Sequence, residues 1–181
     1  MIVDDKKNAA FRIRRVDILG EDDICGLADV TIDCVEGGAS IGFLQPVSRE
    51  NAHAFWHGLA AGVSRGEKIL LVAEDTAGIV GTVTLIPATF ENQPHRADVA
   101  KMQVHRRARR CGIGAALLAA VEREALEAGR TVLVLDTVTG SDAYRLYSRS
   151  GWQRCGEIPD YALWPDGRPC PTTIFFKSLR R

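Results

Sequence analysis

The most informative part of this sequence is a basic, glycine-bounded turn that reads Arg106-Arg107-Ala108-Arg109-Arg110-Cys111-Gly112-Ile113-Gly114. It stands between an expected strand at 98–104 and a long helical pattern from about residue 112 to 128. The glycines let the backbone approach a ligand, and the first amides of the following helix favour an anion. The arginines add charge-assisted donors suited to a pyrophosphate. The turn therefore predicts a phosphate site, and a solvated basic loop before an ordinary helix is the alternative.

Two familiar phosphate loops do not fit this turn. No Gly-Lys-Ser/Thr follows it, as a nucleoside-triphosphate loop would require, and it lacks the three glycines of the dinucleotide fingerprint. A different phosphate ligand is therefore expected.

The elements around the turn can be read from the spacing of apolar residues. In chain order we expect a strand at 11–16, helices at 21–35 and 48–66, strands at 68–74, 79–86 and 98–104, a helix at 112–128, a strand at 131–137, a helix at 141–150, and strands at 152–158 and 172–178. The loop at 75–78 has hairpin length, which predicts an antiparallel pair. The strand, helix and buried strand that span 98–137 predict a parallel crossover.

Composition limits the classes of protein that remain. With 181 residues, 46% hydrophobic and 25% charged, the chain is expected to form one domain over 11–181 after a flexible tail at 1–10. Its formal net charge of +0 and its short apolar runs favour neither nucleic acid nor membrane as a partner. Five cysteines without a C-x-x-C pair indicate reduced thiols, no metal site and a cytoplasmic protein.

The turn at 109–114 resembles the acetyl-CoA loop of the GNAT acetyltransferase superfamily, which reads Gln/Arg-x-x-Gly-x-Gly/Ala. The order of strand, loop, helix and strand around it also matches. Within the superfamily, the resemblance extends to the toxin-resistance acetyltransferases through segments at 37–43, 96–99, 135–141 and 165–168. Arg110 departs from the pattern, since many relatives carry glycine there.

The resemblance implies a fold, a cosubstrate and a set of residues that bind it. The fold is α/β, with a mixed, mostly antiparallel twisted sheet, a central parallel strand pair splayed around acetyl-CoA and helices on both faces. Amides of the turn would hold the CoA pyrophosphate, and the backbone of strand 98–104 would pair with the pantetheine arm. The implied cofactor residues are Met102, Gln103, Val104, Arg109, Arg110, Cys111, Gly112, Ile113, Gly114 and Ala115.

Acetyl transfer to an amine requires a group that takes a proton. An ammonium comparable to that of lysine has a pKa of about 10, so it is mostly charged at neutral pH. Asp98 opens the strand before the turn and Asp136 ends the strand after the helix, so a right-handed crossover brings both toward one crevice. Relatives often carry glutamate where Asp98 stands, which indicates a bridging water. The alternative role for Asp136 is to cap the turn that follows its strand, and the alternative for Asp98 is to be a solvated side chain at a strand edge.

Tyr147 falls where many GNAT enzymes place a tyrosine beside the CoA sulfur, which implies that its hydroxyl protonates the departing thiolate. From its helical spacing alone, core packing is the alternative. We therefore name Asp98, Asp136 and Tyr147 as candidate catalytic residues.

The acceptor pocket is expected along the glycine-rich loop at 36–45. Ser40, Phe43 and Trp164 are the candidate substrate-binding residues, and Trp56 and Tyr161 lie either at that pocket or in the core. His53 and His57 lie four residues apart on one helix, but no third ligand has suitable spacing, so surface or packing roles are expected.

The sequence thus predicts an acetyl-CoA-dependent N-acetyltransferase that acts by direct attack of the primary amine of a small molecule, amino-acid-like or an antibiotic or toxin. The alternatives are a CoA-binding sensor without transfer and a peptide or protein N-acetyltransferase. Nucleic-acid binding through 106–110 is disfavoured by the neutral charge and the lack of aromatic residues nearby. A homodimer is expected only from the family.

Overall fold

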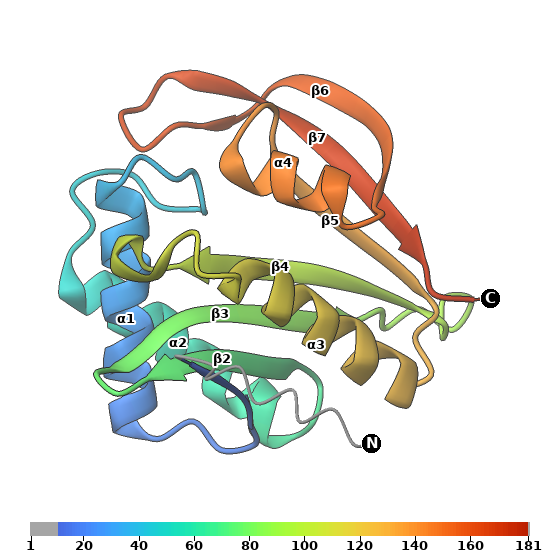
Figure 1. Cartoon of the computed structure of the whole chain (residues 1–181), viewed down its shortest axis with the longest axis horizontal. Helices are drawn as coiled ribbons and strands as arrows, with labels where there is room; N and C mark the ends of the chain where they lie inside the picture. Colours follow the sequence, from blue (N-terminus) through green and yellow to red (C-terminus); the bar gives the residue numbers. More distant parts are fainter. Residues whose placement is uncertain (1–10, 181) are drawn as a thin grey trace, which may run out of the picture.

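Seven strands form a single sheet in the order β1-β2-β3-β4-β5-β7-β6 (Figure 1). The computed structural model describes residues 11–180, so the tail expected at 1–10 lies outside the described residues. The strands are β1 (Arg12–Val16), β2 (Ile69–Asp75), β3 (Gly78–Pro87), β4 (Arg96–Val104), β5 (Val132–Val138), β6 (Gln153–Leu163) and β7 (Pro169–Ser178). The helices are α1 (Glu21–Glu36), α2 (Arg49–Ser64), α3 (Ile113–Glu127) and α4 (Asp142–Arg149), with a 3₁₀ turn η1 (Arg106–Ala108).

The predicted fold class and order of elements are confirmed. All neighbouring strands are antiparallel except β4 and β5, which are parallel and joined through α3. The helix α2 begins after Ser48, whose side chain accepts a hydrogen bond from the Asn51 amide, as the sequence predicts for a capping serine.

Two apolar cores hold helices on the two faces of the sheet. On one face, α3 and α4 pack over alternate strand residues such as Ala97 and Leu133. On the other face, α1 and α2 pack over Leu70 and Val72. Because strand side chains alternate between faces, Asp98 and Asp136, which neighbour buried residues of the α3 face, belong to the face opposite α3.

The pairing of β4 with β5 ends early, and this opens the centre of the sheet. Register partners run only from Arg96–Val132 to Asp98–Val134. Beyond these pairs the two strands diverge, as the green and orange ribbons show in Figure 1. On its other side β4 carries an irregularity, since Thr84 pairs with Ala100 whereas Thr82 pairs with Gln103. One additional residue of β4 therefore forms a bulge, and Lys101 within it has a φ of +53°.

The last two strands are longer than the sequence predicts. We expected β6 to end at Ile158, but it continues past Pro159 to Leu163, and β7 begins at Pro169 instead of Thr172. Since β6 is the edge strand and pairs only with β7, a proline there removes no hydrogen bond of the sheet interior. The pairing shifts between Ile158 and Ala162, which is where the apolar pattern of the sequence breaks.

Among residues 11–180, no helix has both the length and the apolar character that crossing a membrane requires.

Candidate active site

The N-terminus of α3 is built to receive an anion. Gly112 precedes the helix in the left-handed conformation, with φ +84°, which glycine adopts without strain. No side chain caps this end, and the first turn carries no acidic residue. The amides at the start of a helix have no intrahelical acceptor and lie at the positive end of its dipole. Residues 112–115 therefore fit a phosphate group, as the resemblance implies.

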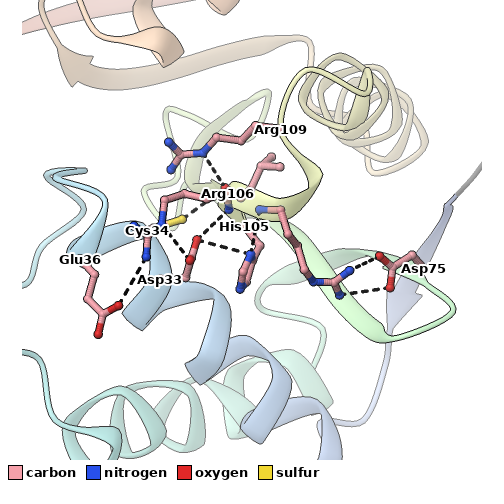
Figure 2. A network of polar contacts seen from close by, with 9 residues as sticks. Asp33, Cys34, Glu36, Asp75, His105, Arg106 and Arg109 are labelled. Atoms are coloured by element: carbon pink, nitrogen blue, oxygen red, sulfur yellow. Dashed lines mark hydrogen bonds and ion pairs between the residues drawn. The ribbon is translucent and has the colours of Figure 1, made fainter.

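Two of the four arginines in the turn are held in ion pairs away from this helix end, which corrects the expectation that all four serve a pyrophosphate. Arg106 bonds to Asp33 of α1 through its side-chain Nε at 2.9 Å. Arg107 forms a two-pronged ion pair with Asp75 at the end of β2 (Figure 2). Both arginines therefore anchor the turn to the scaffold, and Arg109 and Arg110 remain available for a ligand.

Arg109 lies along the free edge of β4. Its Nε donates a hydrogen bond to the Val104 carbonyl at 3.1 Å, and the Cys34 thiol lies 3.5 Å from the same oxygen (Figure 2). Burial raises the pKa of the Cys34 thiol, although Arg109 opposes this shift, so the thiol stays protonated at neutral pH. Arg110 is exposed and adopts a φ of +63°. Arg109 thus places a guanidinium group beside the end of β4.

The expected backbone contacts on β4 divide between its two edges. The Gln103 carbonyl faces β3, because a Cβ added to Gly81 would lie 3.0 Å from it. Strand alternation then places the backbone groups of Met102 and Val104 toward the open side. The Gln103 side chain is buried against α1, where its Oε1 accepts a hydrogen bond from the Thr31 hydroxyl at 2.9 Å. The expected role of Gln103 in cofactor binding is therefore not supported, because its side chain and carbonyl both point away from the opening.

Asp98 and Asp136 share one face of the two diverging strands. Asp98 pairs with Val134 in register, so Asp136 lies one pleat further along β5 on the same face. Asp98 is bound to the Arg96 guanidinium at 2.7 Å, which partly neutralises it. Asp136 is exposed and forms no ion pair or side-chain hydrogen bond with any residue between 11 and 180. Of the two expected carboxylates, Asp136 is therefore the one whose charge is free.

Tyr147 of α4 is 4% exposed and packs against Trp152 and Phe175. Burial raises the pKa of its phenol above the ordinary value, and the negative charge of Asp136 adds to the shift. The hydroxyl therefore stays protonated throughout the neutral range. The ring of Tyr147 is therefore part of the core, and the role of its hydroxyl as an acid stays a prediction.

Two of the three predicted acceptor residues, Ser40 and Phe43, line one cavity. A hollow of about 200 Å³ is lined by Ser40 and Phe43 from the α1–α2 loop and by Leu163 from β6, among others. The Ser40 hydroxyl donates to the Leu163 carbonyl at 2.6 Å, which fastens the loop to the β6–β7 hairpin. Trp164 is the next residue along that hairpin. Trp56, in contrast, is fully buried and donates to Thr31, so it belongs to the core.

Lys101 and Phe55 join this region, and the sequence analysis missed both. The Lys101 ammonium donates to the Ile41 carbonyl at 3.1 Å and lies 5.0 Å from the centre of the Phe55 ring. Phe55 in turn contacts Phe43 edge-on. The available signal was a lysine in the middle of a strand that also carries a candidate catalytic carboxylate, Asp98.

His53 and His57 do not come together as a metal pair. His53 instead lies 2.6 Å from a Glu21 carboxylate oxygen, with the Cys25 thiol close by. These atoms surround the N-terminus of α1, whose dipole opposes a cation. The hydrogen bond between His53 and Glu21 accounts for this grouping without a metal.

Comparisons with known proteins agree with this geometry. Residues 66–154 match the acetyltransferase (GNAT) domain family. A ribosomal-protein-alanine N-acetyltransferase from Brucella melitensis is 29% identical, with a TM-score of 0.75 over 93% of this chain and 99% of that one. The proposed acetyltransferase yncA from Salmonella typhimurium, solved with its cofactor acetyl-CoA, is 20% identical, with a TM-score of 0.75 over 95% of both chains. A proposed phosphinothricin N-acetyltransferase is 18% identical, with a TM-score of 0.76 over 94% of this chain and 99% of that one.

Residues 66–154 therefore form a GNAT acetyltransferase domain. This segment contains β2 to β5 with α3 and the basic turn, so the family assignment covers the part of the fold that forms the opening. Acetyl-CoA is the acetyl donor of this class, as the sequence predicts.

Proposed function

We propose that this protein acetylates the primary amine of a small, amino-acid-like molecule, with acetyl-CoA and the amine bound at the same time. The observation that carries the proposal is the free carboxylate of Asp136 beside the opening between β4 and β5. An exposed carboxylate attracts an ammonium and can accept its proton, directly or through water. The N-terminus of α3, which is suited to an anion, lies on the β4 side of the same opening.

The chain's own residues divide the remaining tasks. Acetyl-CoA, when bound, supplies an acetyl group activated as a thioester. The turn at 109–115 holds its phosphates, and the backbone of Met102 and Val104 faces its arm and offers donors to the thioester oxygen. Tyr147 is the candidate donor of a proton to the departing thiolate, since a phenol is protonated at neutral pH. Asp98, paired with Arg96, supports the ammonium at the closed end of the strands.

A small acceptor is favoured by the size of the hollow that the α1–α2 loop lines. The α1–α2 loop is fastened to the β6–β7 hairpin, and the hollow between them is about 200 Å³. Two of the segments that resemble the toxin-resistance acetyltransferases, 37–43 and 165–168, lie in these same parts of the chain, which supports a role in detoxifying an amino-acid-like compound. The five cysteines are free, in keeping with a cytoplasmic location, and a homodimer is proposed only from the family.

Transfer to a protein N-terminus is a second candidate. It is favoured by the name of the Brucella melitensis relative, which acts on a ribosomal-protein alanine. The N-terminal residues of a protein substrate must pass the α1–α2 loop to reach the hollow. A small amine has no such attached chain.

The test is mass spectrometry after the purified protein has been incubated with acetyl-CoA and one of two substrate pools. The first pool holds amino acids, dipeptides, polyamines and aminoglycosides, and the second holds peptides with N-terminal alanine. Acetylated amino acids or dipeptides support the proposal. Acetylation of the peptides alone supports the second candidate, and binding of acetyl-CoA without any product contradicts both.

A further inference from the structure

Lys101 brings a positive charge to the face of the sheet that carries Asp98 and Asp136. It reaches across that face to Ile41 of the α1–α2 loop and to Phe55 of α2. Its ammonium also lies close to Gly42, where an added Cβ would be 3.3 Å from Nζ. Gly42 lines the hollow proposed for the acceptor. Lys101 is therefore next to that hollow, on the side of β4.

The charge of Lys101 is not balanced locally. Among residues 11–180 no carboxylate comes within ion-pair distance of its Nζ, and the one hydrogen bond to Ile41 uses one of its three donors. Burial lowers the pKa of this lysine, and Asp136 opposes the shift from a distance. A partly desolvated cation without a partner is unfavourable, so an anion that arrives beside it is bound favourably.

The backbone of Lys101 adopts a strained conformation in this position. Its φ of +53° is uncommon for a residue with a side chain, and it occurs in the bulge of β4 where two residues oppose one residue of β3. Such strained positions persist where the surrounding structure enforces them, often at binding sites. Without the bulge, alternation along β4 would place this side chain, after Ala100, on the face of α3.

We propose that Lys101 binds the carboxylate of the acceptor, so that the enzyme selects amines that also carry an acid group. A zwitterion fits this face, since Asp136 attracts its ammonium while Lys101 attracts its carboxylate. Phe55 packs beside Lys101 and contacts Phe43 edge-on, and the two rings offer an apolar surface to the side chain of the acceptor. This inference rests on the proposed function and narrows its substrate class.

The test compares the common amino acids with their amides and with the matching decarboxylated amines, in steady-state assays at saturating acetyl-CoA. We expect wild-type kcat/KM to be about 10- to 100-fold higher for the acids, which is the size of one charge-assisted hydrogen bond. In Lys101→Met the preference disappears, mainly through a higher KM, while kcat on the amides changes little. Lys101→Arg restores part of the preference. Lys68→Met serves as the matched control, because it removes a lysine that directly precedes β2. This variant should keep the preference for acids.

The outcomes separate this inference from the proposed function. Acetylation of amides and simple amines as fast as of acids overturns the role of Lys101 and leaves the acetylation of small amines standing. A uniform loss of activity on every acceptor in Lys101→Met, with normal acetyl-CoA affinity and thermal stability, also overturns the role. Absence of transfer to any small amine overturns both proposals together.

Discussion

Asp136 lies one pleat beyond Val134, the last residue of β5 that pairs with β4, and its carboxylate is exposed and unpaired within residues 11–180. We expect Asp136→Asn to lower kcat about 100-fold, because an amide cannot accept the proton of the acceptor ammonium. Acetyl-CoA affinity, measured by calorimetry, should stay within about twofold, since the side chain is remote from the anion site.

Asp98→Asn provides the comparison for that experiment. Because Arg96 already neutralises Asp98, this substitution should lower kcat by about tenfold or less. Equal losses in the two variants would contradict the assignment of the proton to Asp136.

Tyr147 is the second residue whose role can be tested alone. We expect Tyr147→Phe to lower kcat at least tenfold with the fold intact, since the ring keeps its packing against Trp152 and Phe175 and only the hydroxyl is lost. Because its pKa is raised, Tyr147 should cause no loss of wild-type activity as the pH rises toward 10. Full activity in the variant would assign the residue to the core alone, and the melting temperature serves as the control.

At this scale the sequence predicts positions best where residue type and strand position act together. Asp136 could be placed beside the opening because ligands of α/β sheets bind near the carboxyl ends of strands. The strand continues past Asp136 to Val138, which the sequence did not predict, and the catalytic role of Asp136 stays a prediction. Lys101 could not be placed, because its direction depends on a bulge that no local pattern reveals. Likewise, the ion pairs of Arg106 and Arg107 depend on Asp33 and Asp75, which are distant in the sequence.

Among the elements, the turn before α3 is the one whose sequence and structure agree most closely. We expect Arg109→Ala to weaken acetyl-CoA binding about tenfold, because it removes a guanidinium beside an uncapped helix end. The loss should shrink as salt is added, since part of it is electrostatic. Isothermal titration at two ionic strengths measures both effects.

Arg107→Ala is the matched control for this titration. It also removes one arginine from the turn, but Arg107 is engaged with Asp75. Its acetyl-CoA affinity should therefore stay close to that of the wild type. A loss equal to that of Arg109→Ala would show that the total charge of the turn, and not the position of Arg109, governs binding.

The elements themselves could be predicted in type and order because their apolar periods are long and regular. The bounds of β6 could not be predicted, because an edge strand is exposed on most of its length and its apolar residues do not alternate clearly. The early start of β7 could not be predicted either, because Pro169 and Cys170 pair only with β6. Placement of β7 between β5 and β6 also escapes prediction, since it is decided by contacts between distant segments.

For the whole molecule, an ion-pair cluster joins its first strand to the rest of the fold. Arg14 of β1 contacts Asp23 of α1 and Glu74 of β2, both at 2.6 Å. The hydrogen bond from Arg14 holds the pKa of Glu74 below its ordinary value of 4.5, although partial burial opposes this. A lowered pKa means that the carboxylate stabilises the fold above pH 4.5 and that this contribution is lost as the pH falls through the lower, folded-state pKa.

We therefore expect Glu74→Gln to reduce the free energy of unfolding by about 1 to 2 kcal/mol at pH 7, because a charge-assisted hydrogen bond is replaced by a weaker one. The difference from the wild type should shrink as the pH falls below 4.5. Urea unfolding at pH 7 and at a pH below 4 measures it. A difference that is constant across this range would contradict an ionic origin.

The short pairing of β4 with β5 also affects how the sheet responds to heat and to solvent. Since register partners end at Asp98 and Val134, backbone amides that face the opening on 99–104 should exchange with deuterium faster than those of β5 that face β7. A ligand that occupies the opening takes the place of a missing strand and joins the two halves of the sheet. Acetyl-CoA at about a hundred times its Kd should then add about 2.7 kcal/mol to the free energy of unfolding. The same exchange experiment, repeated with the ligand, should show that the added protection begins at the opening.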